Sequence, residues 1–147
     1  MSIKTTLENN LKQALRNSDD RSKRVIRMVL SAAKLIEIDK GAPLDDPGLM
    51  NVVQKEIKLR RESIADAQRA GRDDLVADAK AEIILLESYL PQALAPEELE
   101  TLARQSIQEA GATSLREMGQ VMKLLVPRLQ GRATGEQANQ VVRKLLS

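Results

Sequence analysis

The sequence predicts an all-α protein, in which an N-terminal four-helix bundle is followed by a C-terminal three-helix bundle. Apolar residues recur at helical spacing from one end of the chain to the other. Glycines, prolines and short polar runs interrupt this pattern and divide it into seven segments. A length of 147 residues suits one compact unit or two small ones.

Four amphipathic segments precede Pro91 and form the predicted N-terminal bundle, residues 1–92. Their expected spans are 3–15, 20–40, 48–70 and 72–90. The second segment has little polar face in its middle, so we expect this helix at the centre of the bundle. The fourth should run antiparallel to the third, because only Gly71 separates them.

Pro91 and Pro96 mark the predicted domain boundary. Two prolines this close together cannot both lie inside a continuous helix. We therefore expect a short hinge, followed by a second domain of residues 96–147. Its first helix should span residues 97–110.

Two capping boxes predict where the last two helices begin. Ser114 with Glu117, and Thr134 with Gln137, each place a hydroxyl three residues before a Glu or Gln side chain. Pro127 should kink the sixth helix or end its regular part.

The composition removes most familiar catalytic groups. The chain has no cysteine and no histidine, which excludes thiolate nucleophiles, imidazole bases and the commonest zinc ligands. Carboxylates are abundant, but none has the spacing of a calcium loop or of a repeated Glu-x-x-His motif. We therefore expect no enzymatic activity, no metal site and no cofactor.

Charge is segregated along the chain. Residues 1–41 hold nine Lys and Arg against five Asp and Glu, residues 42–112 hold eight against fourteen, and residues 113–147 hold six against two. The cations of the last segment are Arg116, Lys123, Arg128, Arg132, Arg143 and Lys144. Such a basic surface suits phosphate groups. The alternative is that these side chains only solvate the outer faces of small helices.

Any bound RNA should be recognised through phosphates and shape, as on a folded tRNA. Tyr89 is the single aromatic residue of the chain, and one ring cannot build a platform for stacked bases. The turn from Gly131 to Gly135 offers a phosphate contact, since Arg132 and the free amides at the start of the last helix could converge there. The alternative is a plain interhelical turn, because the turn lacks the Lys-Ser/Thr of a P-loop.

Two further clusters favour structural roles. Arg60 and Arg61 interrupt the apolar stripe of the third helix, and we expect them to form ion pairs with Glu82 and Glu87 on the fourth. The alternative is a binding site. Met118 and Met122 are spaced four residues apart. They are expected to be core residues; the alternative is a soft, exposed partner groove.

Dispersed motifs in this chain resemble a known family. Gly119-Gln120-Val121-Met122-Lys123, then Gly131-Arg132-Ala133, then Asn139 resemble the tail domain of GatB, the B subunit of the tRNA-dependent amidotransferase. Four upstream motifs resemble the free-standing YqeY proteins, in which this tail module occurs without an amidotransferase. They are Arg61-Glu62-Ser63-Ile64, Gly71-Arg72-Asp73-Asp74-Leu75, Tyr89-Leu90-Pro91 and Gly111-Ala112-Thr113-Ser114.

The resemblance covers nearly the whole chain and implies the same two-bundle architecture. It associates the chain with a carbon–nitrogen ligase family. The chain has no room for the kinase-like part of the amidotransferase subunit, so the resemblance does not imply that activity here.

We therefore expect a non-catalytic accessory protein whose C-terminal module binds tRNA or a tRNA-handling enzyme. The candidate contact residues are Lys123, Arg128, Gly131, Arg132, Gly135, Arg143 and Lys144. The alternative is a protein–protein adaptor that does not bind nucleic acid. The chain begins without a signal-like apolar region and contains no membrane-length apolar window, which predicts a cytoplasmic protein without membrane contact. The sequence leaves the oligomeric state open.

Overall fold

The computed structural model describes residues 2–147, and this part of the chain contains helices and no strands. The predicted all-α class is therefore confirmed. The elements are α1 (Ile3–Arg16), α2 (Asp20–Lys40), α3 (Asp46–Arg69), α4 (Asp73–Glu87), α5 (Pro96–Ala110), the 3-10 helix η1 (Leu115–Glu117), α6 (Met118–Leu129) and α7 (Gly135–Leu146). The chain divides into two compact units, one that ends at Leu90 and one that begins at Pro91.

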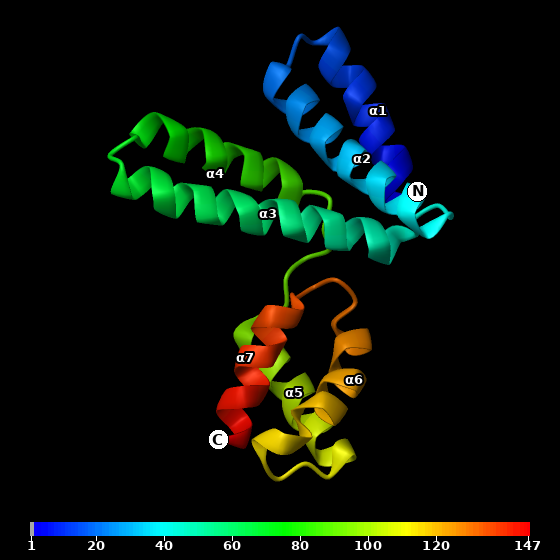
Figure 1. The fold of residues 1–147 in the computed structure, drawn as a ribbon, viewed down its shortest axis with the longest axis vertical. Helices are drawn as coiled ribbons and strands as arrows, with labels where there is room; N and C mark the ends of the chain where they lie inside the picture. The colour runs from blue at the N-terminus through cyan, green and yellow to red at the C-terminus, as the bar shows by residue number, and fades with distance from the viewer. Residues whose placement is uncertain (1) are drawn as a thin grey trace. The chain divides into compact units, whose positions relative to one another are not determined.

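The N-terminal unit consists of two helical hairpins. Helices α1 and α2 lie side by side, as do α3 and α4, and the first hairpin is inclined to the second (Figure 1). Aliphatic side chains fill the space between the hairpins, because the unit has one aromatic residue. The side chains with the least exposure are Leu7, Val25, Val29, Val53 and Leu86.

Side-chain caps determine where three of these helices begin. Ser2, Asp19 and Asp45 each accept a hydrogen bond from a backbone amide of the first turn that follows. Helix α3 begins at Asp46, earlier than predicted, because Pro47 is accommodated in the first turn, where no amide donor is needed. Helix α4 ends at Glu87, three residues before the predicted end.

The outer face of α2 is more exposed than the sequence indicates. Its core residues are buried between the hairpins as expected. Met28 and Leu35, however, have exposed fractions of 44% and 67%. In a unit built from two inclined hairpins, fewer neighbouring helices cover α2 than would cover a helix at the centre of a bundle.

A buried ion cluster joins three helices of the N-terminal unit. The Arg60 side chain, 8% exposed, donates from Nη1 to Glu56 Oε2 at 2.8 Å and from Nε to Glu82 Oε2 at 3.1 Å. Arg24 of α2 also donates to Glu82, at 3.1 Å. The third Arg60 nitrogen, Nη2, contacts the sulfur of Met28 on α2 at 3.4 Å. The predicted pairing of Arg60 with Glu82 is thus confirmed, and it extends to α2.

Arg60→Met should lower the free energy of unfolding by about 3–5 kcal/mol, because it leaves two nearly buried carboxylates with one cation in place of two. Arg61→Met is the matched control, since Arg61 is exposed and lies 3.9 Å from Glu87. The control should change stability by no more than about 1 kcal/mol. Urea unfolding of both variants measures the difference, and equal effects would contradict a buried cluster.

The C-terminal unit packs α5, α6 and α7 around a second aliphatic core. Its best buried residues include Ala103, Val121, Leu125 and Val142. Helix α6 continues two residues past Pro127, which lies inside the helix.

One of the two predicted capping boxes is present. Thr134 accepts a hydrogen bond from the Gln137 amide, and the Gln137 side chain accepts one from the Thr134 amide. The box predicted at Ser114 is wrong, because that side chain makes no cap hydrogen bond. A 3-10 turn intervenes, and the carboxylate of Glu117 accepts from the amide and hydroxyl of Thr113 instead.

The segment after Pro91 is hydrogen-bonded into the C-terminal unit before α5 begins. The Leu94 amide donates to the carbonyl of Arg132 at 2.9 Å, and Arg132 Nε donates to the carbonyl of Gln92 at 2.9 Å. The Leu94 side chain packs against the second core. These residues therefore belong structurally with residues 96–147.

A fragment of residues 91–147 should be more stable than one of residues 96–147, by about 2–3 kcal/mol. The longer fragment retains the two hydrogen bonds, worth about 1 kcal/mol each, and part of the burial of Leu94. Thermal unfolding followed by circular dichroism compares them, and Leu94→Ala in the longer fragment should give an intermediate midpoint. Identical midpoints for both fragments would show that residues 91–95 contribute nothing.

Candidate nucleic-acid interface

Three of the candidate cations have exposed side chains that are not engaged within the part of the chain that the structure describes. Lys123 lies on α6, while Arg143 and Lys144 lie in the last turn of α7. None of the three side chains forms a hydrogen bond or ion pair with any residue in the range 2–147. Because Ala138 and Val142 turn the opposite face of α7 into the core, Arg143 and Lys144 project away from it.

Arg128 is held by the unit itself. Its guanidinium forms an ion pair with Glu109 on α5 and donates to the hydroxyl of Ser106 at 3.3 Å. Ser106 is fully buried and donates in turn to the carbonyl of Leu102 at 2.9 Å. Arg128 therefore joins α6 to α5, and the carboxylate of Glu109 already offsets its charge.

Arg132 is also engaged. Besides its bond to the Gln92 carbonyl, its Nη2 lies 3.3 Å from a carboxylate oxygen of Glu98. A phosphate at this turn would have to compete with that carboxylate. The sequence could not indicate these acidic partners, because Glu109 and Glu98 lie 19 and 34 residues from their arginines.

The turn before α7 is shaped by backbone conformation and by its cap. Gln130 and Gly131 both have positive φ, 50° and 75°, which glycine adopts without strain. The capping box occupies the Gln137 amide. Gly135, the first residue of α7, is exposed, and a Cβ added there would meet no atom within 4 Å. Gly135 is thus open to solvent, but Arg132 is not free to serve a phosphate there.

The family-motif residues of α3 make local structural contacts. Arg61 pairs with Glu87 across the hairpin, as predicted, and Ser63 donates to the Leu59 carbonyl at 3.0 Å. Gly71, with φ of 69°, follows the C-cap of α3. Of these contacts, only the pair of Arg61 and Glu87 joins α3 to α4.

Arg72 and Tyr89 lie at the two ends of α4. Arg72 donates to both carboxylate oxygens of Asp74, at 3.2 and 3.0 Å. This hydrogen bonding lowers the pKa of Asp74 and raises the pKa of Arg72. Tyr89 Oη accepts a hydrogen bond from Asn10 of α1 at 2.8 Å, and Pro91, which is exposed, starts the next unit.

The two family-motif residues of α6, Gly119 and Met122, differ in burial. Met122 packs against the second core together with Met118, which confirms the core prediction for both. Gly119 is exposed, its φ is not positive, and a Cβ added there would meet no atom within 4 Å. Neither packing nor backbone conformation inside the unit requires a glycine at this position.

Within residues 2–147, no group of three or more acidic side chains is placed to hold a metal ion. Across the same residues, the structure contains no helix with the length and apolar character needed to cross a bilayer.

The fold and this surface define a small all-helical protein whose C-terminal unit presents exposed cations on two helices. The chain belongs to the family of YqeY-like proteins, whose model matches residues 4–146.

Several curated relatives carry the name "Altered inheritance of mitochondria protein 41, mitochondrial". The protein from Eremothecium gossypii is 40% identical over 95 residues, which cover 62% of this chain and 52% of the relative. Those from Vanderwaltozyma polyspora and Lachancea thermotolerans are 36% and 37% identical, and cover 65% and 68% of this chain. The chain spans about half the length of these relatives, 52–54%.

The cytoplasmic localisation predicted from the sequence is corrected by this comparison, because the relatives are named as mitochondrial proteins.

Gly119→Ala should raise the free energy of unfolding by about 0.5–1 kcal/mol, because alanine restricts the unfolded chain and fits the open space. If a partner's backbone approaches this face of α6, the same variant should bind that partner less well. Thermal unfolding of the wild type and the variant checks the first effect. A lower midpoint would show that Gly119 has a role inside the unit.

Proposed function

We propose that this protein is a non-catalytic accessory protein built of two helical bundles, and that its C-terminal unit binds folded RNA such as tRNA. The observation that supports this proposal is the exposure of Lys123, Arg143 and Lys144 without internal partners. The mitochondrial names of the relatives favour a mitochondrial setting.

The cations of this unit fall into two groups. Arg104, Arg128 and Arg132 pair with carboxylates of α5 and contribute little field at the surface. The three unpaired cations, with the exposed Arg116 of η1, remain available to phosphates. Phosphate contacts position a protein on RNA without reading its sequence, and they release counterions.

Two features of the chain favour shape recognition over base recognition. The C-terminal unit has no aromatic residue, so it offers no ring on which bases could stack. Its free cations lie on helices, which present them at fixed spacing to a folded backbone.

The alternative is an adaptor that binds a tRNA-handling enzyme or another protein. It is favoured by the apolar side chains Leu115 and Val126, which are 46% and 48% exposed in the same unit. Val126 shares the exposed face of α6 with Gly119 and Lys123, which would suit a helix packed closely against it.

Changing Lys123, Arg143 and Lys144 together to Gln should weaken tRNA binding while the helical signal stays intact, because Gln keeps a good helix propensity. The slope of log affinity against log salt should flatten by roughly one unit for each lost phosphate contact. Different tRNA sequences should be affected alike, because base edges are not contacted. Mobility shifts at two salt concentrations measure both quantities.

A variant with the same loss of charge, Lys55, Lys80 and Arg104 to Gln, is the control and should retain both affinity and slope. Wild-type protein without tRNA affinity at low salt would reject RNA binding and leave the adaptor. Equal losses in the control and the triple variant would show that only net charge matters.

A further inference from the structure

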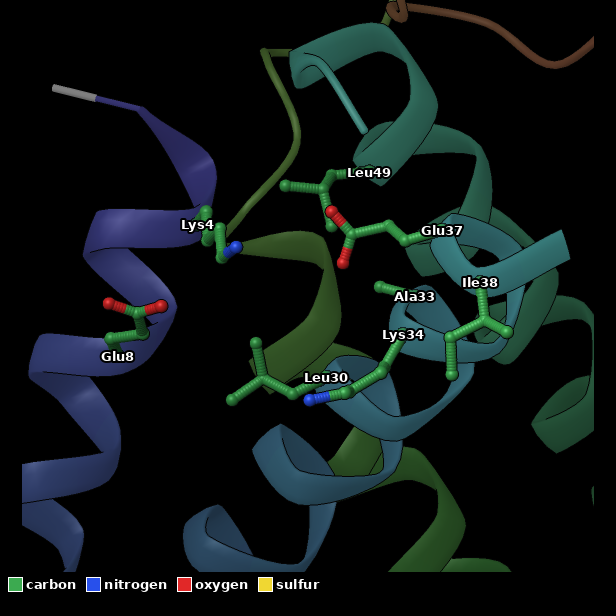
Figure 2. A pocket seen from close by; sticks show the side chains of 8 residues that line it. All are labelled: Lys4, Glu8, Leu30, Ala33, Lys34, Glu37, Ile38 and Leu49. Atoms are coloured by element: carbon green, nitrogen blue, oxygen red, sulfur yellow. The ribbon is translucent and has the colours of Figure 1, made fainter. Parts of the chain in front are cut away.

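A groove lies between α1 and α2 and has no role in the function proposed above. Its volume is about 420 Å³, and its floor is apolar. The residues that line it are Lys4, Glu8, Leu30, Ala33, Lys34, Glu37, Ile38 and Leu49. Figure 2 shows α1 on one side, α2 on the other, and Leu49 of α3 closing one end.

Of the charged side chains at the rim, Glu37 has a hydrogen-bond partner, while the two lysines have no ion-pair partner within the described part of the chain. Glu37 accepts a hydrogen bond from the Leu44 amide at 2.9 Å, so one of its oxygens is held by the loop before α3. Lys4 and Lys34 form no ion pair with any residue that the structure describes. Their side chains turn toward the space between the two helices, one from each side (Figure 2).

Helical register extends this groove along the hairpin. On α1, Lys12 lies two turns beyond Lys4, and Leu15 follows on the same side. On α2, Arg27 lies two turns before Lys34 on the stripe that leads to Ile38. Leu15 and Ile38 are 49% and 66% exposed, and Lys12 and Arg27 have no internal partner within residues 2–147.

We propose that this hairpin groove binds an acidic amphipathic helix of a partner protein. Apolar side chains of that helix would cover Leu30, Ile38 and Leu15, and its carboxylates would meet the unpaired lysines and Arg27 along both rims. Four cations, Lys4, Lys12, Arg27 and Lys34, stand against two carboxylates, Glu8 and Glu37. The fit to an acidic partner therefore rests on charge as well as on shape.

An acidic helix fits this groove better than RNA or an anionic bilayer does. Two antiparallel helices accept a third in the depression between them. The 14 residues of α1 give the groove a length of about 21 Å at 1.5 Å per residue, which corresponds to a partner helix of similar length. RNA would leave the apolar floor uncovered, and a flat bilayer would not enter the depression.

The test uses the full chain and a labelled synthetic peptide of about 14 residues, with leucines at helical spacing on one face and glutamates on the rest. A scrambled peptide of identical composition is the comparison. Fluorescence anisotropy should show that the amphipathic peptide binds at least about tenfold more tightly than the scrambled one. Ile38→Asp and Lys34→Glu should each weaken binding by roughly tenfold.

Matched controls lie on α4, where Ile84 is 70% exposed and Lys80 is exposed. Ile84→Asp and Lys80→Glu should leave peptide affinity unchanged, and circular dichroism should show that all four variants are folded. The triple variant Lys123→Gln, Arg143→Gln and Lys144→Gln should bind the peptide with the same affinity as the wild type. That result separates this groove from the RNA-binding proposal.

Several results would overturn the groove proposal. Equal affinity for both peptides would mean non-specific charge attraction. Binding to phosphatidylglycerol vesicles without peptide binding would identify a lipid surface. Self-association of the wild type that Ile38→Asp abolishes would identify a second copy of this chain as the occupant.

Discussion

The N-terminal unit depends on the position of one guanidinium group. Arg60 is directional where the surrounding aliphatic core is not, because leucine, isoleucine and valine pack in many ways with similar energy. Its bonds reach α4 through Glu82, and Glu82 reaches α2 through Arg24. The cluster therefore specifies one inclination of the two hairpins. An aromatic core would achieve such specificity through ring shape, which this composition does not allow.

The helices could be predicted because their signals are local in sequence. Features that depend on tertiary contacts, such as the exposure of single side chains, could not. The span of α2 and the capping box at Thr134 depend on neighbours in sequence, and both match the prediction. The pairing of Arg60 with Glu82 could be expected because two antiparallel helices bring those positions together. The box at Ser114 failed, because a 3-10 turn competes for the same residues. The exposure of Leu35 could not be predicted, since it depends on how the hairpins cross.

The candidate interface illustrates the same limit. Lys123 and Arg132 are equivalent in a count of charges, yet only the first lacks an internal partner. Acidic residues of α5 neutralise the arginines that pack against that helix. The basic character of residues 113–147 is thus smaller in the folded unit than in the sequence. Charge segregation indicated the region in which the unpaired cations lie, while the packing of α5, α6 and α7 determines which cations of that region lack partners.

Tyr89 has a consequence of a different kind. It is the single aromatic side chain of the chain, and it lies in the N-terminal unit, where its hydroxyl accepts a bond from Asn10. Near-ultraviolet absorbance and intrinsic fluorescence therefore report on that unit alone, and the C-terminal unit is optically silent at those wavelengths. In one sample, the tyrosine signal then follows unfolding of the N-terminal unit, while far-ultraviolet circular dichroism follows the helices of both units. A difference between the two transition midpoints would show that the two units unfold separately.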